Sequence, residues 1–339
     1  MSHDPKLTIY TIALNPKPSI PINTNKWLFR NLIGEGGNTT PLQDSFIIAQ
    51  IFTKFIRALD TPEMYSDENS KKCMTANQTD IASDEVNANI HLHSHQFIIE
   101  GKVEGGSYGR KRKKTSTLNK AENSVVNVGD AITEDFYFLL YTPIMSNKSI
   151  LMVQSYSDDT IDTVMKKFWV NFLSHSTTHT QPTITRFIPQ SIIDDFRRNS
   201  TVSGFTFSTN IPGETLLENV NNILNRNYKV TVQVTPITDN LSINEFEQTI
   251  EPLKNTGFAR NMNLGQFTNK KATLTDNTTN KSSPFELDSA FEIEPTILLS
   301  KYIDFGEGDI DFNLIKNYCF SLLEDIKSEI YIQNAIQER

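Results

Sequence analysis

The sequence predicts a mixed α+β protein: a largely antiparallel N-terminal sheet with packed helices, followed by a C-terminal part in which strands and helices alternate. Residues 7–14, 136–143 and 149–156 are short apolar segments typical of strands. Residues 43–60 and 312–330 instead repeat apolar side chains at helical spacing. A length of 339 residues exceeds the usual limit of a single core, so we expect two domains.

We expect the first domain to span residues 1–180. Its first strand, residues 7–14, is followed by the core helix of residues 43–60. Residues 61–89 are polar and acidic with few large apolar side chains, so we expect a long surface excursion there. Strand signals return at residues 89–103.

The rest of this domain is expected to be a hairpin and a helix. Residues 136–143 and 149–156 flank the turn-forming pair Ser146 and Asn147, which predicts an antiparallel hairpin. An amphipathic helix then begins near Asp159, with acidic residues where a helix N-terminus favours them. We expect this helix to pack on the hairpin.

We expect the second domain, residues 181–339, to be an α/β domain that ends in a long amphipathic helix. The predicted elements are a short helix from Pro189 to Asn199, strands at 203–208 and 229–234, helices at 214–226 and 242–254, and a final helix at 312–330. Residues 269–283 form a polar tract without apolar periodicity, which predicts a loop or linker.

Charge and cysteine content exclude several classes of protein. The net charge of -8 repels polyanions except where a local patch reverses the sign. Cys73 and Cys319 are the only cysteines, which excludes a disulfide framework and favours a reducing, cytoplasmic location. No apolar run approaches the ~18 residues needed to cross a bilayer, so we expect no membrane partner.

A basic segment is the first candidate site. Glycines at positions 105, 106 and 109 predict a flexible turn, and a run of five basic residues follows it: Arg110, Lys111, Arg112, Lys113 and Lys114. Such a basic hairpin at residues 105–114 is able to bind a nucleic-acid backbone, and Tyr108 to stack on an exposed base. The alternative is a solvated hairpin tip or a targeting-like basic run.

A histidine cluster is the second candidate. His91, His93 and His95 alternate, which places all three imidazoles on one face of a strand. Imidazoles so arranged are able to hold zinc or another transition metal. The alternative is a solvent-facing or half-buried strand face, with no cofactor at all.

A third candidate is the pair Glu100 and Lys102. With Asp84 and Glu85 upstream, the pair is similar to the acidic-x-Lys core of metal-dependent nucleases, in which carboxylates hold the metal and lysine stabilises transition-state charge. This reading makes Glu100 and Lys102 catalytic and requires a divalent metal. No nucleophile elbow, zinc-protease helix or kinase signature is present in the sequence.

Three segments carry a resemblance to a group of proteins. The strand and glycine turn of residues 98–106, the hairpin of residues 136–154 and the helix after it resemble uncharacterised bacterial proteins found with anti-phage defence genes. The likeness covers roughly residues 90–175. It implies a setting in antiviral defence and carries over no catalytic residue.

The function that we expect is a non-catalytic binding or assembly component, which contacts nucleic acid or an acidic partner protein through the basic hairpin. An enzyme is less favoured, and a metal-dependent nuclease is the alternative. A structural homo-oligomer is the second alternative, because the amphipathic helices are able to pack against copies of themselves.

Overall fold

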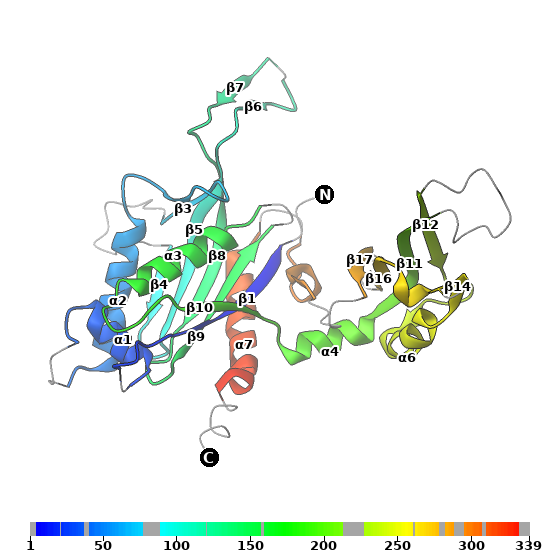
Figure 1. Ribbon diagram of the computed structural model, residues 1–339. Helices are drawn as coiled ribbons and strands as arrows, with labels where there is room; N and C mark the ends of the chain where they lie inside the picture. The colour runs from blue at the N-terminus through cyan, green and yellow to red at the C-terminus, as the bar shows by residue number, and fades with distance from the viewer. Residues whose placement is uncertain are drawn as a thin grey trace. The chain divides into compact units, whose positions relative to one another are not determined.

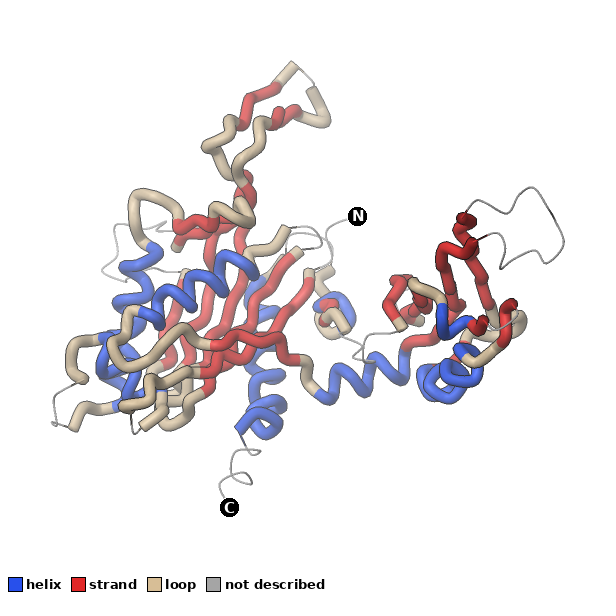
Figure 2. Tube along the Cα trace, viewed as in Figure 1, coloured by secondary structure: helices blue, strands red, loops and turns tan. Residues whose placement is uncertain are grey.

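The computed structural model shows an α+β protein with antiparallel sheets (Figures 1 and 2). It describes residues 5–20, 22–36, 41–76, 89–119, 121–156, 159–212, 227–259, 262–277, 282–287, 295–306 and 310–331.

The chain divides into two compact units. The first comprises Met1–Phe187 together with Thr296–Arg339, and the second comprises Ile188–Pro295. The final helix therefore belongs with the N-terminal part of the chain, whereas the sequence placed it in the second domain. The physical reason is that its apolar stripe is buried on the first sheet.

The first unit is built on one large antiparallel sheet. Its strands lie in the order β10-β1-β9-β8-β5-β3-β2, with β18 also pairing with β1 and β4 with β5. The bounds are β1 Lys6–Ala13, β2 Tyr65–Asp67, β3 Lys72–Thr75, β4 Ile90–His93, β5 Ile98–Ser107, β8 Ile132–Tyr141, β9 Lys148–Ser155, β10 Thr183–Phe187 and β18 Ile297–Leu298. The predicted strand at residues 7–14 and the predicted hairpin are confirmed as β1 and as β8 with β9.

Helices cover both faces of this sheet (Figure 1). On one face α1 (Asn25–Leu32), α2 (Asp44–Leu59) and α3 (Asp162–Ser174) pack against the alternating apolar side chains of β5, β8 and β9. The centre of this core is aromatic: the ring of Phe55 stacks on that of Trp169, with centroids 5.0 Å apart. The other face is covered by α7 (Phe312–Tyr331), which buries Ile315, Cys319 and Leu323.

Two predictions for the first unit were wrong. The strand expected at residues 89–103 is a pair, β4 and β5, joined by a turn at residues 94–97 in which Phe97 has φ 57°. That turn has neither glycine nor proline, so no residue in the sequence marks the end of one strand and the start of the next. The expected excursion at 61–89 contains β2 and β3, which bury Asp67 and Met74; residues 77–88 lie outside the described residues.

The second unit has its own antiparallel sheet, in the order β12-β11-β16-β17. Its elements are α4 Gln190–Asn199, β11 Ser200–Pro212, β12 Asn227–Val234, α6 Ile243–Lys254, β16 Asn269–Asp276 and β17 Ser282–Glu286. The capping pair of α6 is confirmed, because the Ser242 hydroxyl accepts from the Glu245 amide and Glu245 accepts from the Ser242 amide.

Another prediction fails in this unit. Residues 269–283, expected to be a loop, supply β16, which pairs with β11 on one side and β17 on the other. Ala272 and Leu274 of β16 face the core, and polar side chains alternate with them. A strand with one polar face has a composition similar to that of a loop, and for this reason the sequence predicted a loop here. The helix predicted at 214–226 lies outside the described residues.

Across the described part of the chain, no helix is both long enough and apolar enough to span a bilayer.

Candidate functional site

The basic segment lies on a two-stranded ribbon between β5 and β8. Its strands are β6 (Arg112–Thr115) and β7 (Asn123–Val126), which in the described part of the chain pair with each other and with no third strand. Figure 2 shows this short pair of strands extending beyond the ends of the large sheet. An isolated pair of strands is marginally stable in water, so a partner that binds it also stabilises it.

The five cations of the ribbon are exposed. Arg110 and Lys111 precede β6, and the register places Arg112 opposite Val126, Lys113 opposite Val125 and Lys114 opposite Ser124. Since side chains alternate along a strand, Arg112 and Lys114 lie on one face of the ribbon and Lys113 on the other. Among the described residues, no ion pair joins any of these five side chains to a carboxylate.

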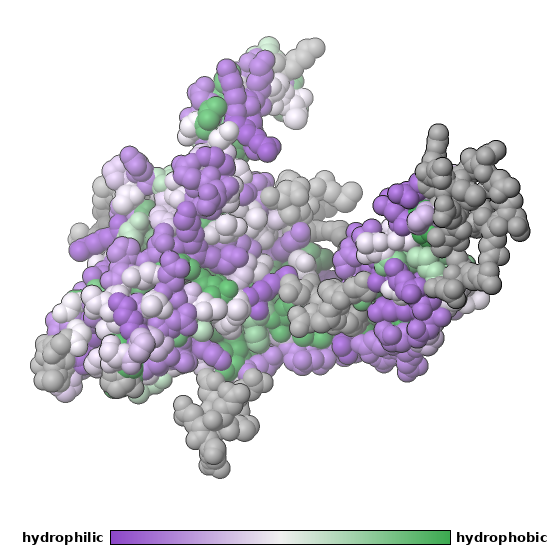
Figure 3. Space-filling view, in the orientation of Figure 1, coloured by the Kyte–Doolittle hydropathy of each residue, from purple (hydrophilic) through white to green (hydrophobic). Residues whose placement is uncertain are grey.

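The surface of the ribbon is mainly hydrophilic, with a small hydrophobic area (Figure 3). Leu118, Val125 and Val128 are exposed there. Residues 108–131 include six basic and two acidic residues, in a chain whose net charge is negative. The ribbon is therefore the positive part of an acidic protein.

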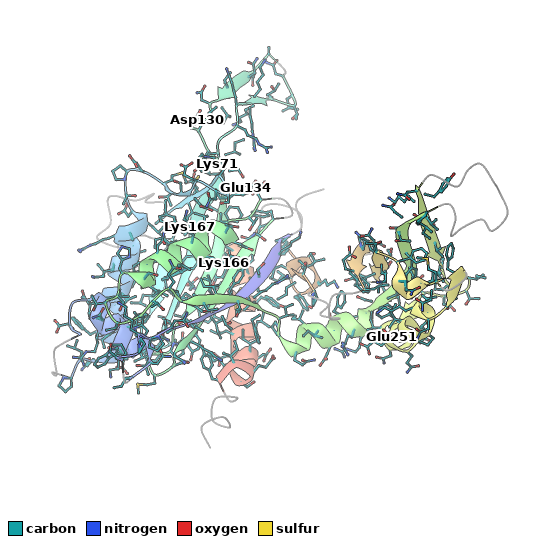
Figure 4. The ribbon with its side chains drawn as sticks, viewed as in Figure 1. Lys71, Asp130, Glu134, Lys166, Lys167 and Glu251 are labelled. Atoms are coloured by element: carbon teal, nitrogen blue, oxygen red, sulfur yellow. The ribbon has the colours of Figure 1, made fainter. Side chains whose placement is uncertain are left out.

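Tyr108 sits at the base of the ribbon. Its side chain is half-buried, its amide donates to the Lys71 carbonyl, and the Lys71 ammonium lies 5.5 Å from the ring centroid. Figure 4 shows Lys71 at this junction, with Asp130 on the ribbon above it. Lys71 in turn pairs with Glu68, which lowers the pKa of that carboxyl. The structure thus places Tyr108 in a junction rather than at a free tip.

The glycines before the basic run do not form the expected turn. Gly105 and Gly106 lie within β5, where a Cβ on Gly106 would come 1.8 Å from the Ile132 carbonyl oxygen. The turn comes at Gly109, whose φ of 88° favours glycine. The glycines are needed because neighbouring strands approach closely, a reason that sequence alone does not reveal.

A second cluster surrounds Glu100 on the face of the sheet covered by α7. The Glu100 side chain is almost fully buried, and its Oε1 lies 2.7 Å from Lys316 Nζ and 3.1 Å from His93 Nε2. Lys102, two residues along β5, donates to Asp135 at 3.0 Å. The structure brings Glu100 and Lys102 to one face, as the nuclease reading requires, but both are already paired. Asp84 and Glu85 lie outside the described residues.

A polar pocket of about 380 Å³ opens beside this cluster, between β4, β5, β8 and the first turn of α7. Its polar lining residues are Asn89, His91, Glu100, Lys102, Tyr137, Asp311, Asn313 and Lys316. Gly101 permits the close approach of β4, because a Cβ there would lie 2.0 Å from the Asn89 carbonyl oxygen.

Tyr137, which lines the pocket, and Cys319 of α7 are both buried. The Tyr137 hydroxyl is buried beside the Glu100 carboxylate. Burial, followed by the nearby Cys319 and Glu100, raises the pKa of Tyr137 well above its ordinary value. Burial and the Glu100 charge likewise raise the pKa of the Cys319 thiol, so this cysteine is not a thiolate at neutral pH.

The three histidines separate in the structure. His93 faces Glu100, His91 lines the pocket, and β4 ends at His93, so His95 lies in the following turn and not on the strand. Within the described ranges, no three histidine, cysteine, aspartate or glutamate side chains gather in an arrangement suited to a metal ion.

Sequence reasoning missed Lys316, Tyr137 and Asp311. Lys316 lies beside the apolar stripe of the predicted final helix, and Tyr137 reads as an ordinary strand residue. Nothing in the sequence indicates that the helix covers β5, because the two are separated by more than 200 residues.

Comparison of the chain with protein-family models, with curated proteins and with solved structures found no match.

Proposed function

We propose that this protein is a non-catalytic binding or assembly component that binds a nucleic-acid backbone through the ribbon of residues 108–131. The single observation that carries the proposal is the set of five exposed cations on a narrow ribbon, with no carboxylate paired to them among the described residues. Such free cations release counterions when they meet phosphates.

The shape of the ribbon favours a groove over a flat surface. The B-DNA major groove admits a two-stranded β-ribbon. Arg112 and Lys114 project from one face and Lys113 from the other, so a ribbon lying in a groove presents cations to both flanking backbones. A flat acidic protein surface meets one face only. This two-sided charge favours duplex nucleic acid over an acidic partner protein.

The five cations are suited to phosphates, and Tyr108 is held at the base by Lys71. We therefore propose binding with little sequence preference. The resemblance of residues 90–175 to defence-associated bacterial proteins supports antiviral defence as the setting of this binding.

The experiment is a titration of labelled duplex DNA, duplex RNA and polyglutamate by fluorescence anisotropy. We expect duplex binding that is lost in the variant with Arg112, Lys113 and Lys114 replaced by alanine. The matched control replaces Arg57, Arg198 and Lys229, which are exposed elsewhere and change the net charge equally. Equal loss in both variants, or tighter binding of polyglutamate than of duplexes, would contradict the proposal.

A further inference from the structure

A second pocket lies among the helices α1, α2 and α3, which cover one face of the first sheet (Figure 1). Its volume of about 450 Å³ is in the range of small-molecule sites. The ribbon contributes no residue to it, so the proposed function leaves this pocket unassigned. The apolar and aromatic lining residues are Leu32, Ala58, Tyr65, Phe168 and Phe172, and the polar ones are Asn31, Lys54, Asn171 and His175.

Three aromatic rings form one wall of this pocket. The ring of Tyr65 meets that of Phe168 edge-on with centroids 5.2 Å apart, and Phe172 lies nearly parallel to Phe168 at 5.8 Å. Phe168 is buried and also packs against Phe55 and Trp169, so the core holds the wall in place before a ligand binds. A further flat ring is stabilised by stacking or edge contacts on such a wall.

The pocket has little net charge. Lys54 is the ammonium group in its lining, and none of the described residues that line it is a carboxylate. The Lys54 ammonium donates to the carbonyl of Leu32, the last residue of α1, and α3 also ends beside the pocket. The C-terminal end of a helix carries partial negative charge, so these two helix ends offset much of the ammonium charge. An uncharged ligand is therefore favoured over an anion.

Two lining groups keep hydrogen-bonding capacity for a ligand. An ammonium group has three donors, and within the described chain Lys54 directs one of them to Leu32. Nδ1 of His175 lies 2.6 Å from the Asn171 carbonyl oxygen and therefore carries the ring hydrogen, which leaves Nε2 as an acceptor in the neutral ring. The side-chain amides of Asn31 and Asn171 are already bonded to neighbouring side chains.

We infer that this pocket binds an uncharged aromatic amide or lactam of one or two fused rings. The ring of such a ligand stacks on the aromatic wall, its carbonyl accepts from Lys54, and its N–H donates to His175. An aliphatic amide lacks the ring. An aromatic carboxylate lacks the N–H donor and carries a charge that the two helix ends oppose.

The test uses the full chain, isothermal titration calorimetry and three matched probes. Carbostyril has a fused aromatic ring and a lactam, caprolactam has the lactam without an aromatic ring, and quinaldate has the fused ring with a carboxylate in place of the lactam. We expect one site for carbostyril and binding of the other two that is weaker by roughly 10-fold or more. Absence of carbostyril binding, or binding of either control probe with equal affinity, would overturn the inference.

Two variants assign the binding to this pocket. Lys54→Met removes the ammonium group and should weaken carbostyril binding roughly 10-fold, and Phe172→Leu, which removes part of the aromatic wall, should also weaken it. Lys54 is exposed and Phe172 is half-buried, so both variants should fold, which circular dichroism verifies. Arg57→Met, exposed on the same helix and outside the pocket, is the matched control and should bind as the parent does. Unchanged affinity in both pocket variants would place the site elsewhere and contradict the inference.

The contact with His175 has its own test. N-methylcarbostyril keeps the ring and the carbonyl but has no N–H donor, so the parent should bind it more weakly than carbostyril. In His175→Phe, which has no acceptor, the difference between the two ligands should shrink. A difference of the same size in parent and variant would overturn the assignment of the N–H donor to His175.

Discussion

Lys316 on the final helix lies 2.7 Å from the buried carboxylate of Glu100 on β5, although 216 residues separate them. This ion pair, with His93 on its other side, joins the last helix of the chain to the centre of the first sheet. The charge of Glu100 is tolerated there because two partners meet it.

Replacing Lys316 by methionine should lower the free energy of unfolding by about 2–3 kcal/mol. The change leaves the buried Glu100 charge without its ammonium partner, while the partly exposed His93 stays beside it. Chemical denaturation followed by tryptophan fluorescence measures the effect, since Trp27 and Trp169 both belong to the first unit.

Two further variants make this prediction specific. Lys327→Met on the same helix removes an exposed pair and should cost no more than about 0.5 kcal/mol. Adding Glu100→Gln to Lys316→Met should recover part of the loss, because the buried charge is gone. Equal effects of Lys316→Met and Lys327→Met would show that the buried pair has no special role.

Replacing Phe55 by alanine should cost about 3–5 kcal/mol. Its ring is fully buried and stacks on Trp169 at 5.0 Å, and it also contacts Phe138 and Phe168. Phe46→Ala on the same helix is the control, because that ring is 47% exposed and should cost far less. Thermal unfolding by circular dichroism measures both; similar midpoints would contradict the packing described for α2.

The salt dependence of duplex binding should report the number of ribbon cations engaged. If all five meet phosphates, the logarithm of the binding constant should fall with the logarithm of salt concentration with a slope of roughly -4.5 on DNA. The triple alanine variant should reduce this slope by roughly 2.7. Anisotropy titrations at several salt concentrations measure it, and an unchanged slope in the variant would place the contacts elsewhere.

Two aspartates should have opposite effects on the free energy of unfolding at acidic pH. Hydrogen bonds from Lys167 and Ser70 lower the pKa of Asp67, whereas burial raises the pKa of Asp162 despite a hydrogen bond from Tyr10. The Asp67 carboxylate lies 2.6 Å from the ammonium group of Lys167 on α3. Lys167 is labelled in Figure 4.

The signs follow from linkage. Asp67 stabilises the fold above the pKa it has when unfolded, and that contribution is lost as the pH falls through its lowered folded pKa. Asp162 binds its proton more tightly in the folded state than in the unfolded state. The free energy of unfolding therefore rises as the pH falls from the raised pKa of the folded state towards the ordinary pKa near 3.9.

The measurement is the free energy of unfolding from about pH 6 to about pH 2. Asp67→Asn should make the acid loss of stability shallower, and Asp162→Asn should make it steeper. A shift in the same direction for both variants would contradict the environments described for these two side chains.

Local patterns were sufficient to predict several elements. The apolar spacing of residues 43–60 and 312–330 predicted α2 and α7, and the capping pair Ser242 and Glu245 predicted the start of α6. The predictions failed where local chemistry is ambiguous. Polar β16 resembled a loop, and Gly105 and Gly106 resembled a turn, because the features that decide these segments are the neighbouring strands.

Of the two candidate sites, one could be predicted from the sequence and the other could not. The basic run was evident from the sequence, because five consecutive cations remain a charged patch in any exposed conformation. The pocket was not: Glu100 and Lys102 were identified as a pair, but their partners Lys316 and Asp135 come from α7 and β8.

The sequence by itself determined the α+β class, the principal helices and the position of the positive charge, since each depends on spacing or composition within a short segment. Only the tertiary structure decided that the last helix covers the first sheet and buries Glu100 against Lys316. That placement depends on burial of apolar surface between segments far apart in the chain, and no local pattern encodes it.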